Sequence, residues 1–285
     1  MKLALKGIQI LREEGPISLG KKGSRFVFNQ ALNQTYKIGS GRECPLCGFT
    51  GRKFAAAGIP PRKEARCPDC GASERHRLLT HYIENETNLF EGGQQVLYFA
   101  PTDEIARNLQ EYGNRLITTD LSLSDVNIHA DITRLPFPDN TFDIVICSHV
   151  LEHIPDDSAA MSELYRILSD AGYALIMIPK DKGREQTYED KSITSPEERK
   201  KEFGQHDHVR WYGTDFSERL SEAGFEVSTI TYAENLSADI VDKYRLKVDK
   251  TNQTSDNLTM EYSGDIIYED IHRCEKKPLD RREAG

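Results

Sequence analysis

Four short apolar runs, separated by amphipathic stretches, constrain the fold of this 285-residue chain most strongly. Each run is rich in β-branched or aromatic residues and has the length of a buried strand. The runs are residues 96–100, 116–119, 144–147 and 173–178. Helical patterns, such as residues 104–112 and 158–168, lie between them. Because strands that alternate with helices build parallel βαβ units, we predict an α/β fold with a doubly wound, mostly parallel sheet.

Two copies of the pattern C-P-x-C-G precede these runs, with 19 residues between the cysteine pairs. The cysteines are Cys44, Cys47, Cys67 and Cys70. Gly48 and Gly71 follow the pairs and permit the positive φ of a tight turn around a metal-bound thiolate. Such pairs are typical of zinc sites, and four thiolates complete the tetrahedral shell of the ion. We therefore predict a small zinc ribbon with structural Zn²⁺.

The chain divides into three predicted parts. Residues 1–40 form an amphipathic helix and a linker, residues 41–72 form the zinc ribbon, and residues 73–285 form the main domain, with a charged insertion at residues 181–208 that forms a solvated helix or a lid. The helix at residues 1–14 either docks on the main domain or lies on anionic lipid headgroups. No apolar run reaches 18 residues and no signal-cleavage pattern follows the N-terminal segment, so we expect a cytoplasmic protein, with peripheral membrane contact through this helix as the open alternative.

Charge is distributed unevenly along the chain. Residues 1–80 hold 15 Lys and Arg against 6 Asp and Glu, whereas the whole chain holds 37 against 46. The remaining body is therefore strongly acidic and repels phosphate backbones, which argues against tight non-specific binding of nucleic acid. The basic front, including residues 75–77, could still contact an anionic partner or pair with the acidic body.

The run from Asp139 to Ile154 resembles the fourth strand and following loop of the methyltransferase type 11 group of class I S-adenosylmethionine-dependent methyltransferases. The resemblance covers residues 95–180, and the pattern fits as far as Tyr232. It implies a Rossmann-like sheet with S-adenosylmethionine across the carboxyl ends of the parallel strands, which is where ligands bind in open α/β sheets.

Acidic residues at two strand ends are candidates for binding this donor. Asp120 ends the second strand, twenty residues beyond Ala100, where a carboxylate can accept hydrogen bonds from ribose hydroxyls. By resemblance, Asp131 would accept from the adenine amino group and the Ile132 amide would meet a ring nitrogen. The predicted donor-binding set is completed by Tyr98, Ala100, Leu121, Ser148 and His149.

The first loop departs from the family pattern. Where the family has acidic-x-Gly-x-Gly-x-Gly, this chain has Tyr98, Ala100, Thr102 and Glu104. The donor carries no diphosphate, so the loop does not need to cradle phosphates, and Ala100 is small enough for close approach of the backbone. A fold that has lost the donor and acts as a non-catalytic scaffold is the alternative.

His149 and His153 stand four residues apart, a spacing that suits two metal ligands on one helical face. We do not predict a metal there, because the family resemblance already accounts for the run and no third ligand follows at a fitting spacing.

The segment from Gly204 to Tyr212 is the predicted acceptor side. We predict His206 and His208 as catalytic bases, and His153, Arg210 and Tyr212 as substrate contacts, since imidazoles, a fixed cation and aromatic rings suit a polyhydroxylated acceptor. The alternative is that these polar residues only hold a lid in place.

Three functions follow as hypotheses. The first is O-methylation of a small molecule such as a sugar, or of a lipid-linked surface-glycan intermediate; residues 11–16 weakly resemble the start of polysaccharide-assembly proteins. The second is an RNA methyltransferase that grips RNA through the zinc ribbon, although the acidic body makes nucleic acid a less favoured partner. The third is the non-catalytic scaffold.

Overall fold

The computed structural model describes residues 35–58, 61–247 and 270–277. The predicted N-terminal helix and most of the predicted linker therefore lie outside the described residues. Within the described ranges, no helix is both long and apolar enough to cross a membrane.

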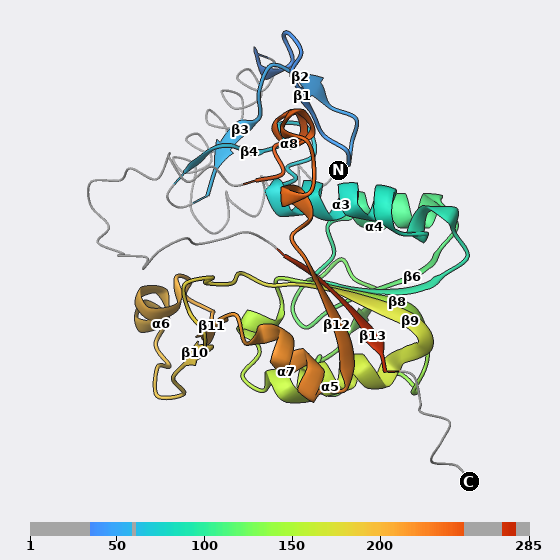
Figure 1. The fold of residues 1–285 in the computed structure, drawn as a ribbon, viewed down its shortest axis with the longest axis vertical. Coiled ribbons are helices and arrows are strands. Elements are labelled where there is room, and N and C mark those ends of the chain that lie inside the picture. The colour runs from blue at the N-terminus through green and yellow to red at the C-terminus, as the bar shows by residue number, and fades with distance from the viewer. Residues whose placement is uncertain (1–34, 59–60, 248–269, 278–285) are drawn as a thin grey trace, which may run out of the picture.

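The cysteine module consists of two small antiparallel pairs of strands (Figure 1). The first pair is β1 (Arg42–Glu43) with β2 (Thr50–Gly51), and the second is β3 (Ala55–Ala57) with β4 (Arg62–Arg66). Each cysteine turn lies next to one of these pairs, as expected for the predicted ribbon.

A seven-stranded sheet forms the centre of the main domain. Its strands are β5 (Gln95–Phe99), β6 (Arg115–Asp120), β7 (Ile128–His129), β8 (Phe142–Ser148), β9 (Leu168–Met177), β12 (Phe225–Ile230) and β13 (Ile271–Lys276). The spatial order is β12-β13-β9-β8-β5-β6-β7, and β13 runs opposite to the other six strands. This topology confirms the predicted doubly wound, mostly parallel sheet.

Helices cover both faces of the sheet (Figure 1). The helices α3 (Glu74–Glu86) and α4 (Asp103–Glu111) lie on one face, while α5 (Asp157–Ile167) and α7 (Phe216–Glu222) lie on the other. Beyond β9, β10 (Tyr188–Glu189), α6 (Pro196–Phe203) and β11 (Arg210–Trp211) form a separate small unit. The helix α8 (Ala238–Tyr244) lies beside β1.

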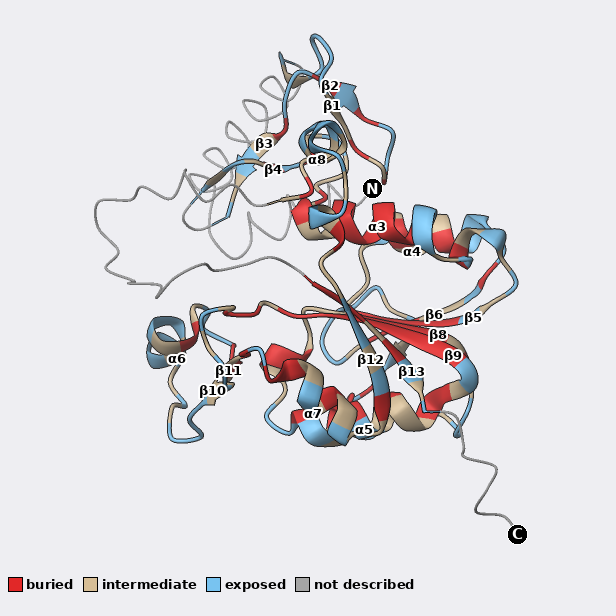
Figure 2. Ribbon diagram, in the orientation of Figure 1, coloured by how far each residue is buried: buried red, intermediate tan, exposed pale blue. Residues whose placement is uncertain are grey.

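The strands are buried on both faces, as Figure 2 shows for the centre of the sheet. Because side chains alternate across a strand, β5 sends Val96 and Tyr98 into the core shared with α3, and Leu97 and Phe99 into the core shared with α5 and α7. The first core continues into the cysteine module through apolar residues such as Phe54. The module is therefore packed against the main domain.

Most predicted elements are present, and the differences are local. The strand β9 begins at Leu168, directly after α5, rather than near residue 173. The last described strand, β13, lies outside the four apolar runs of the sequence and runs from Ile271 to Lys276. The charged insertion at 181–208 is only partly solvated, because it buries Phe203 and His208 and adds β10. Two-residue strands carry too little periodicity to be predicted.

Arg77 joins three separate segments. Its side chain is completely buried and donates to the carbonyl oxygens of four residues from the cysteine module and the end of α8. The four acceptors are Ala65, Ala72, Tyr244 and Arg245. The guanidinium also lies 4.3 Å from the ring centre of Phe54. Burial lowers the pKa of Arg77, against the attraction of nearby acidic groups. Arg77 is therefore unavailable to an anionic partner.

Replacing Arg77 should destabilise the protein. We expect Arg77→Ala to lower the free energy of unfolding by about 3–5 kcal/mol, because buried carbonyl groups lose their donors. Arg77→Lys, which keeps the charge and some donors, should lose less. Chemical denaturation followed by circular dichroism measures both, and Arg75→Ala, on the same helix, should change the free energy by less than about 0.5 kcal/mol. Equal losses in the Arg75 and Arg77 variants would contradict this role.

Candidate functional site

The four predicted zinc ligands lie together. The Sγ atoms of Cys44 and Cys70 are 3.7 Å apart, as are those of Cys47 and Cys67, and all four lie within 4.8 Å of one another. Zinc binds thiolates at about 2.3 Å, so a regular tetrahedron has S···S edges of about 3.8 Å. The cluster therefore fits one tetrahedral zinc ion without a position left for water.

Both cysteine turns have the backbone geometry predicted from the sequence. Gly48 has a φ of 69° and Gly71 a φ of 80°. Each glycine N–H donates to the carbonyl of the first cysteine of its pair, at 2.9 Å for Cys44 and 3.0 Å for Cys67. The four thiols lie close enough to shift one another's pKa values, which are lowered for Cys47 and Cys67 and raised for Cys44 and Cys70.

A second site lies at the carboxyl ends of the parallel strands. The chain proceeds from β5 through β6 to β7 on one side, then returns to place β8 on the other side of β5. The pairs Phe99↔Thr119 and Phe99↔Cys147 bring the residues that follow these strands side by side. Strands lie about 4.8 Å apart, so Asp120, Ala100 and Ser148 span roughly 10 Å, the size of a nucleoside. Ligands bind in α/β sheets at such a switch point.

The backbone is strained on both sides of this switch point. Ala100 has a φ of 45° and His149 a φ of 56°, in the left-handed region that non-glycine residues rarely occupy. The backbone N–H groups are held, since Ala100 donates to the Thr119 carbonyl at 3.0 Å and His149 to that of Met177 at 2.8 Å. Such strain concentrates at functional sites. Ala100 thus adopts the kind of backbone conformation that a glycine of the family pattern would favour.

The two predicted acidic anchors are fixed by their own loops. The Oδ1 atom of Asp120 accepts from the Ser122 amide at 2.7 Å, the Ser122 hydroxyl at 3.1 Å and the Leu123 amide at 2.8 Å. Asp131 accepts likewise from Thr133, and these hydrogen bonds lower the pKa of Asp131. Each carboxylate is therefore oriented, and Oδ2 has no hydrogen bond within the described residues.

Apolar residues beside these anchors differ in exposure. Leu121 is 70% exposed and Leu123 is 45% exposed, which is unusual for large apolar side chains in this fold. Ile132 is buried in the core shared with α5, so its backbone rather than its side chain remains as a candidate donor contact. An adenine ring that covered Leu121 and Leu123 would remove their apolar surface from water, which is energetically favourable.

Tyr98 has a different place from the one predicted. Its side chain points into the core shared with α3 and is 2% exposed. Its hydroxyl donates to the Thr102 hydroxyl at 3.3 Å and accepts from the Thr102 amide at 3.2 Å, and burial raises the pKa of Tyr98. Tyr98 therefore closes the first loop from beneath, and this placement argues against direct contact with a donor.

Arg210 and Tyr212 are also buried, at 2% and 0% exposure, which argues against the predicted contact with an acceptor. Arg210 donates to the carbonyls of Leu151, Ile154 and Pro155 and to Glu189. The Tyr212 hydroxyl donates to Asp157 at 2.8 Å. Together they hold the turn after β8 in place, a structural role that their residue types alone did not reveal.

The predicted histidines separate into exposed and buried members. The side chain of His206 is 71% exposed, and its Nδ1 lies 3.6 Å from Asp207. His208 is 2% exposed, and burial lowers its pKa. His208 packs edge to face on His153, with ring centres 4.7 Å apart. His206 is therefore the predicted base that solvent and an acceptor can reach.

Glu152 is the residue that the sequence analysis missed. It is 1% exposed, and its Oε1 lies 3.3 Å from His149 Nδ1. Burial alone would raise the pKa of Glu152, but the interactions with His149 and the charge of His153 outweigh it, and the pKa lies below its ordinary value. The sequence signal that could have identified Glu152 is its position between His149 and His153.

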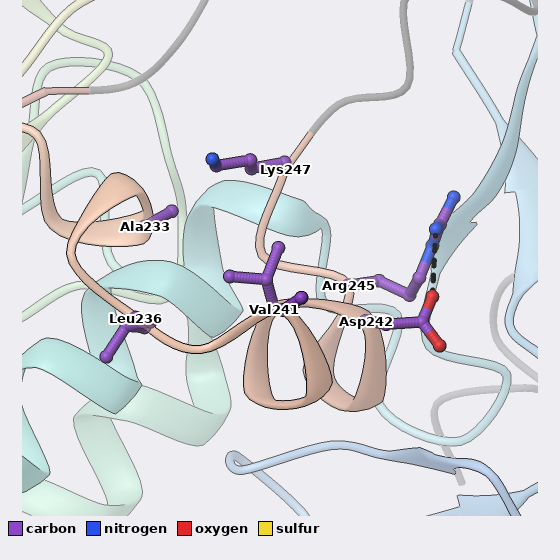
Figure 3. A pocket seen from close by; sticks show the side chains of 7 residues that line it. Ala233, Leu236, Val241, Asp242, Arg245 and Lys247 are labelled. Carbon is purple, nitrogen blue, oxygen red and sulfur yellow. Dashed lines mark hydrogen bonds and ion pairs between the residues drawn. The ribbon is translucent and has the colours of Figure 1, made fainter.

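A hollow at the end of β12 is separate from this edge (Figure 3). It is lined by residues 233–247 around α8, and Arg245 pairs with Asp242 across one side at 3.4 Å. None of the predicted donor residues lines it.

The strand order defines a doubly wound α/β domain with a candidate ligand site at its switch point. Residues 97–176 match the family described as "Methyltransferase domain". This stretch of the chain, which runs from β5 to β9, is therefore similar to a methyltransferase domain.

Known proteins resemble parts of the chain. "Arginine-hydroxylase NDUFAF5, mitochondrial" of Danio rerio is 31% identical over 140 residues, 44% of this chain and 43% of that protein. A demethylmenaquinone methyltransferase of Geobacillus sp. is 31% identical over 70 residues, 24% of this chain and 30% of that one. The structure of an S-adenosylmethionine-dependent methyltransferase from Mesorhizobium loti has 14% identity and a TM-score of 0.44, covering 65% of this chain and 92% of that one. The chain spans less than half the length of the curated relatives it matches.

Metal analysis tests the cysteine centre. We expect one tightly held zinc per chain after dialysis against a weak chelator, because the sulfur separations fit the ion. Cys67→Ser should lose this zinc and destabilise the module, whereas Cys147→Ser, a buried cysteine of β8, should keep it. Less than about half a zinc per wild-type chain would contradict the assignment.

Calorimetry with S-adenosylhomocysteine tests the strand edge. Asp120→Ala should weaken binding roughly tenfold or more, because a charge-assisted hydrogen bond contributes about 1.5–3 kcal/mol. Asp120→Asn keeps an acceptor for the Ser122 loop and should show the loss of charge alone. Asp170→Asn, an exposed residue at the other end of the sheet, should bind as the wild type does. Unchanged affinity in Asp120→Ala would remove Asp120 from the site.

Proposed function

We propose that this protein transfers a methyl group from S-adenosylmethionine to an oxygen atom of a small polyhydroxylated acceptor, such as a sugar or a lipid-linked glycan intermediate. The observation that carries the proposal is the switch point itself. Two strained residues, Ala100 and His149, and the oriented carboxylate of Asp120 meet there, within the stretch that matches the methyltransferase domain. The carboxylates and backbone groups at the ends of these strands suit the binding of a nucleoside that carries no diphosphate.

Different residues at the strand ends would bind different parts of S-adenosylmethionine. Asp120 and Asp131 would accept from the ribose and the adenine, and Leu121 would cover an apolar face of the donor. Ser148 and the strained backbone at His149 would lie next to the reacting end, since they follow the strand on the other side of the switch point. Alignment of donor and acceptor supplies much of the acceleration in such a displacement.

The acceptor is proposed to bind under the segment from residue 204 to residue 212. When bound, S-adenosylmethionine supplies a methyl group on a sulfonium, so an O–C bond forms as the S–C bond breaks and sulfur keeps the electron pair. His206 would take the hydroxyl proton, because its imidazole is exposed and can be oriented by Asp207.

RNA binding through the cysteine module is less favoured by the described residues. Several cations of the module are already paired: Arg42 with Glu64 at 2.8 Å, and Arg62 with Glu74 at 3.1 Å. Arg77 is buried. Part of the positive charge near the module is therefore used within the fold, and less of it remains for phosphates.

The names of the relatives do not point to one acceptor, since one is a quinone methyltransferase and another an arginine hydroxylase. A direct screen therefore tests the proposal. Radiolabelled S-adenosylmethionine is incubated with the protein and lipid-linked glycans, total RNA or protein extract from the source organism. Label should enter the glycan fraction. His206→Ala should reduce turnover while S-adenosylhomocysteine binds with nearly unchanged affinity.

Two outcomes would overturn the proposal. Label that enters RNA alone would make the protein an RNA methyltransferase. Failure of the folded wild type to bind S-adenosylhomocysteine would favour the non-catalytic scaffold.

A further inference from the structure

A second cluster of metal-binding side chains lies beside the donor edge and is not used in the function proposed above. Glu152 and His153 belong to the short helical turn at Leu151–His153, directly after β8, and His208 belongs to the segment before β11. Their ligand atoms all lie within 4.8 Å of one another. We propose that these three residues bind one divalent transition-metal ion, for which Zn²⁺ and Co²⁺ are suitable probes.

The sequence analysis considered a metal only on His149 and His153, whereas this cluster joins His153 to Glu152 and His208. The third ligand is His208, which lies 55 positions after His153 and therefore has no local spacing signal. Val209 N–H donates a hydrogen bond to the Glu152 carbonyl at 2.9 Å, which holds the segment before β11 against the turn after β8. Tertiary structure thus assembles a site that a helical i, i+4 pattern does not describe.

The two imidazoles are oriented as metal ligands usually are. The Nδ1 atom of His208 lies 3.2 Å from the carbonyl oxygen of Phe203, and the Nδ1 atom of His153 lies 3.4 Å from the carboxylate of Asp207. Each of these oxygen atoms is an acceptor and so favours the proton on the neighbouring Nδ1. This leaves the lone pair on each Nε2, which is the arrangement that outer partners impose on metal-bound histidines.

The interior of the cluster lacks hydrogen-bond partners. His208 Nε2 and Glu152 Oε2 are buried and have no hydrogen bond within the described residues. His208 is 2% exposed and Glu152 is 1% exposed. His149 lies beside Oε1 only, so a cation between Oε2 and the two imidazoles would compensate the remaining cost of burying these polar atoms.

The three ligand atoms lie within 4.8 Å of one another and would need to move only slightly closer together to bind one ion. Three ligand atoms at about 2.1 Å from one ion in a tetrahedral arrangement lie about 3.4 Å apart. His153 can close the difference by side-chain rotation, since its side chain is 31% exposed while the other two are buried. The same exposure provides a route for the ion and leaves coordination positions that a hydroxyl or water could occupy.

Two imidazoles and one carboxylate select the class of ion. This set suits Zn²⁺, Fe²⁺ and related borderline ions rather than Ca²⁺ or Mg²⁺, which prefer oxygen ligands alone. Three protein ligands with open positions are typical of catalytic rather than structural sites. The cluster is therefore chemically distinct from the four-thiolate centre.

The role of the ion rests on the proposed function. An acceptor hydroxyl bound at an open position would have its pKa lowered by the cation, as metal-bound water does. Since Glu152 and His153 follow His149 in the loop after β8, this oxygen would be held next to the donor edge. The inference narrows the acceptor to molecules with a hydroxyl that can coordinate a metal.

The experiment uses the full chain with its thiolate centre already filled with zinc. Co²⁺ is then titrated and followed by its visible absorption. We expect one additional Co²⁺ per chain, with d–d bands but without the sulfur-to-cobalt charge-transfer band that occupancy of the cysteine centre would produce. Absence of a second bound ion in the wild type would overturn the proposal.

Variants identify the ligands and keep the test independent of folding. Glu152→Gln, which preserves shape, should lose the second Co²⁺. Asp207→Asn, at an exposed carboxylate, should weaken it roughly 10- to 100-fold, the usual effect of removing an outer partner of a ligand histidine. Asp170→Asn is the matched control and should bind as the wild type does. Equal Co²⁺ affinity in the wild type and Glu152→Gln would overturn the proposal and leave His149 as the partner of Glu152.

Donor binding separates this inference from the proposed function. S-adenosylhomocysteine should bind Glu152→Gln within about threefold of the wild-type affinity, which also shows that the variant is folded. A second Co²⁺ in a protein that transfers no methyl group would support the metal site and contradict the proposed function.

Discussion

The buried guanidinium of Arg77 is the interaction on which the arrangement of this protein depends. One side chain at the start of α3 binds carbonyls of the cysteine module and of the end of α8. A buried cation with this many backbone acceptors admits few alternative positions for the three segments, because any displacement leaves polar groups unsatisfied. The module, the helix and the sheet therefore behave as one packed unit, even though the sequence divides them into separate patterns.

At the carboxyl ends of the parallel strands, the sheet topology brings distant residues together. The reversal of strand order between β5 and β8 places Ala100, Asp120 and His149 side by side, although up to 49 positions separate them. Their loops are held by backbone hydrogen bonds in strained conformations. The residues that would bind a donor are therefore already in place, and the packing of the sheet offsets the free energy of their strained backbone.

The candidate site could be predicted where its residues end strands or repeat a local motif. The cysteine pairs with Gly48 and Gly71, and the carboxylates at Asp120 and Asp131, lie where the patterns placed them. The predicted ligand contacts of Tyr98, Arg210 and Tyr212 could not be judged in this way, because they depend on burial. Polar residue types suggested contact with ligands, whereas burial decides whether a side chain faces a ligand or the interior.

The sequence by itself determined the order and type of the elements, because hydrophobic periodicity and cysteine spacing are local properties that survive in any fold of this chain. Only the tertiary structure decided which distant groups meet. Glu152 and His153 come from one turn, and His208 comes from a segment packed onto it. Such a cluster has no sequence spacing of its own, since its distances are set by the packing of the loop after β8 against the segment before β11.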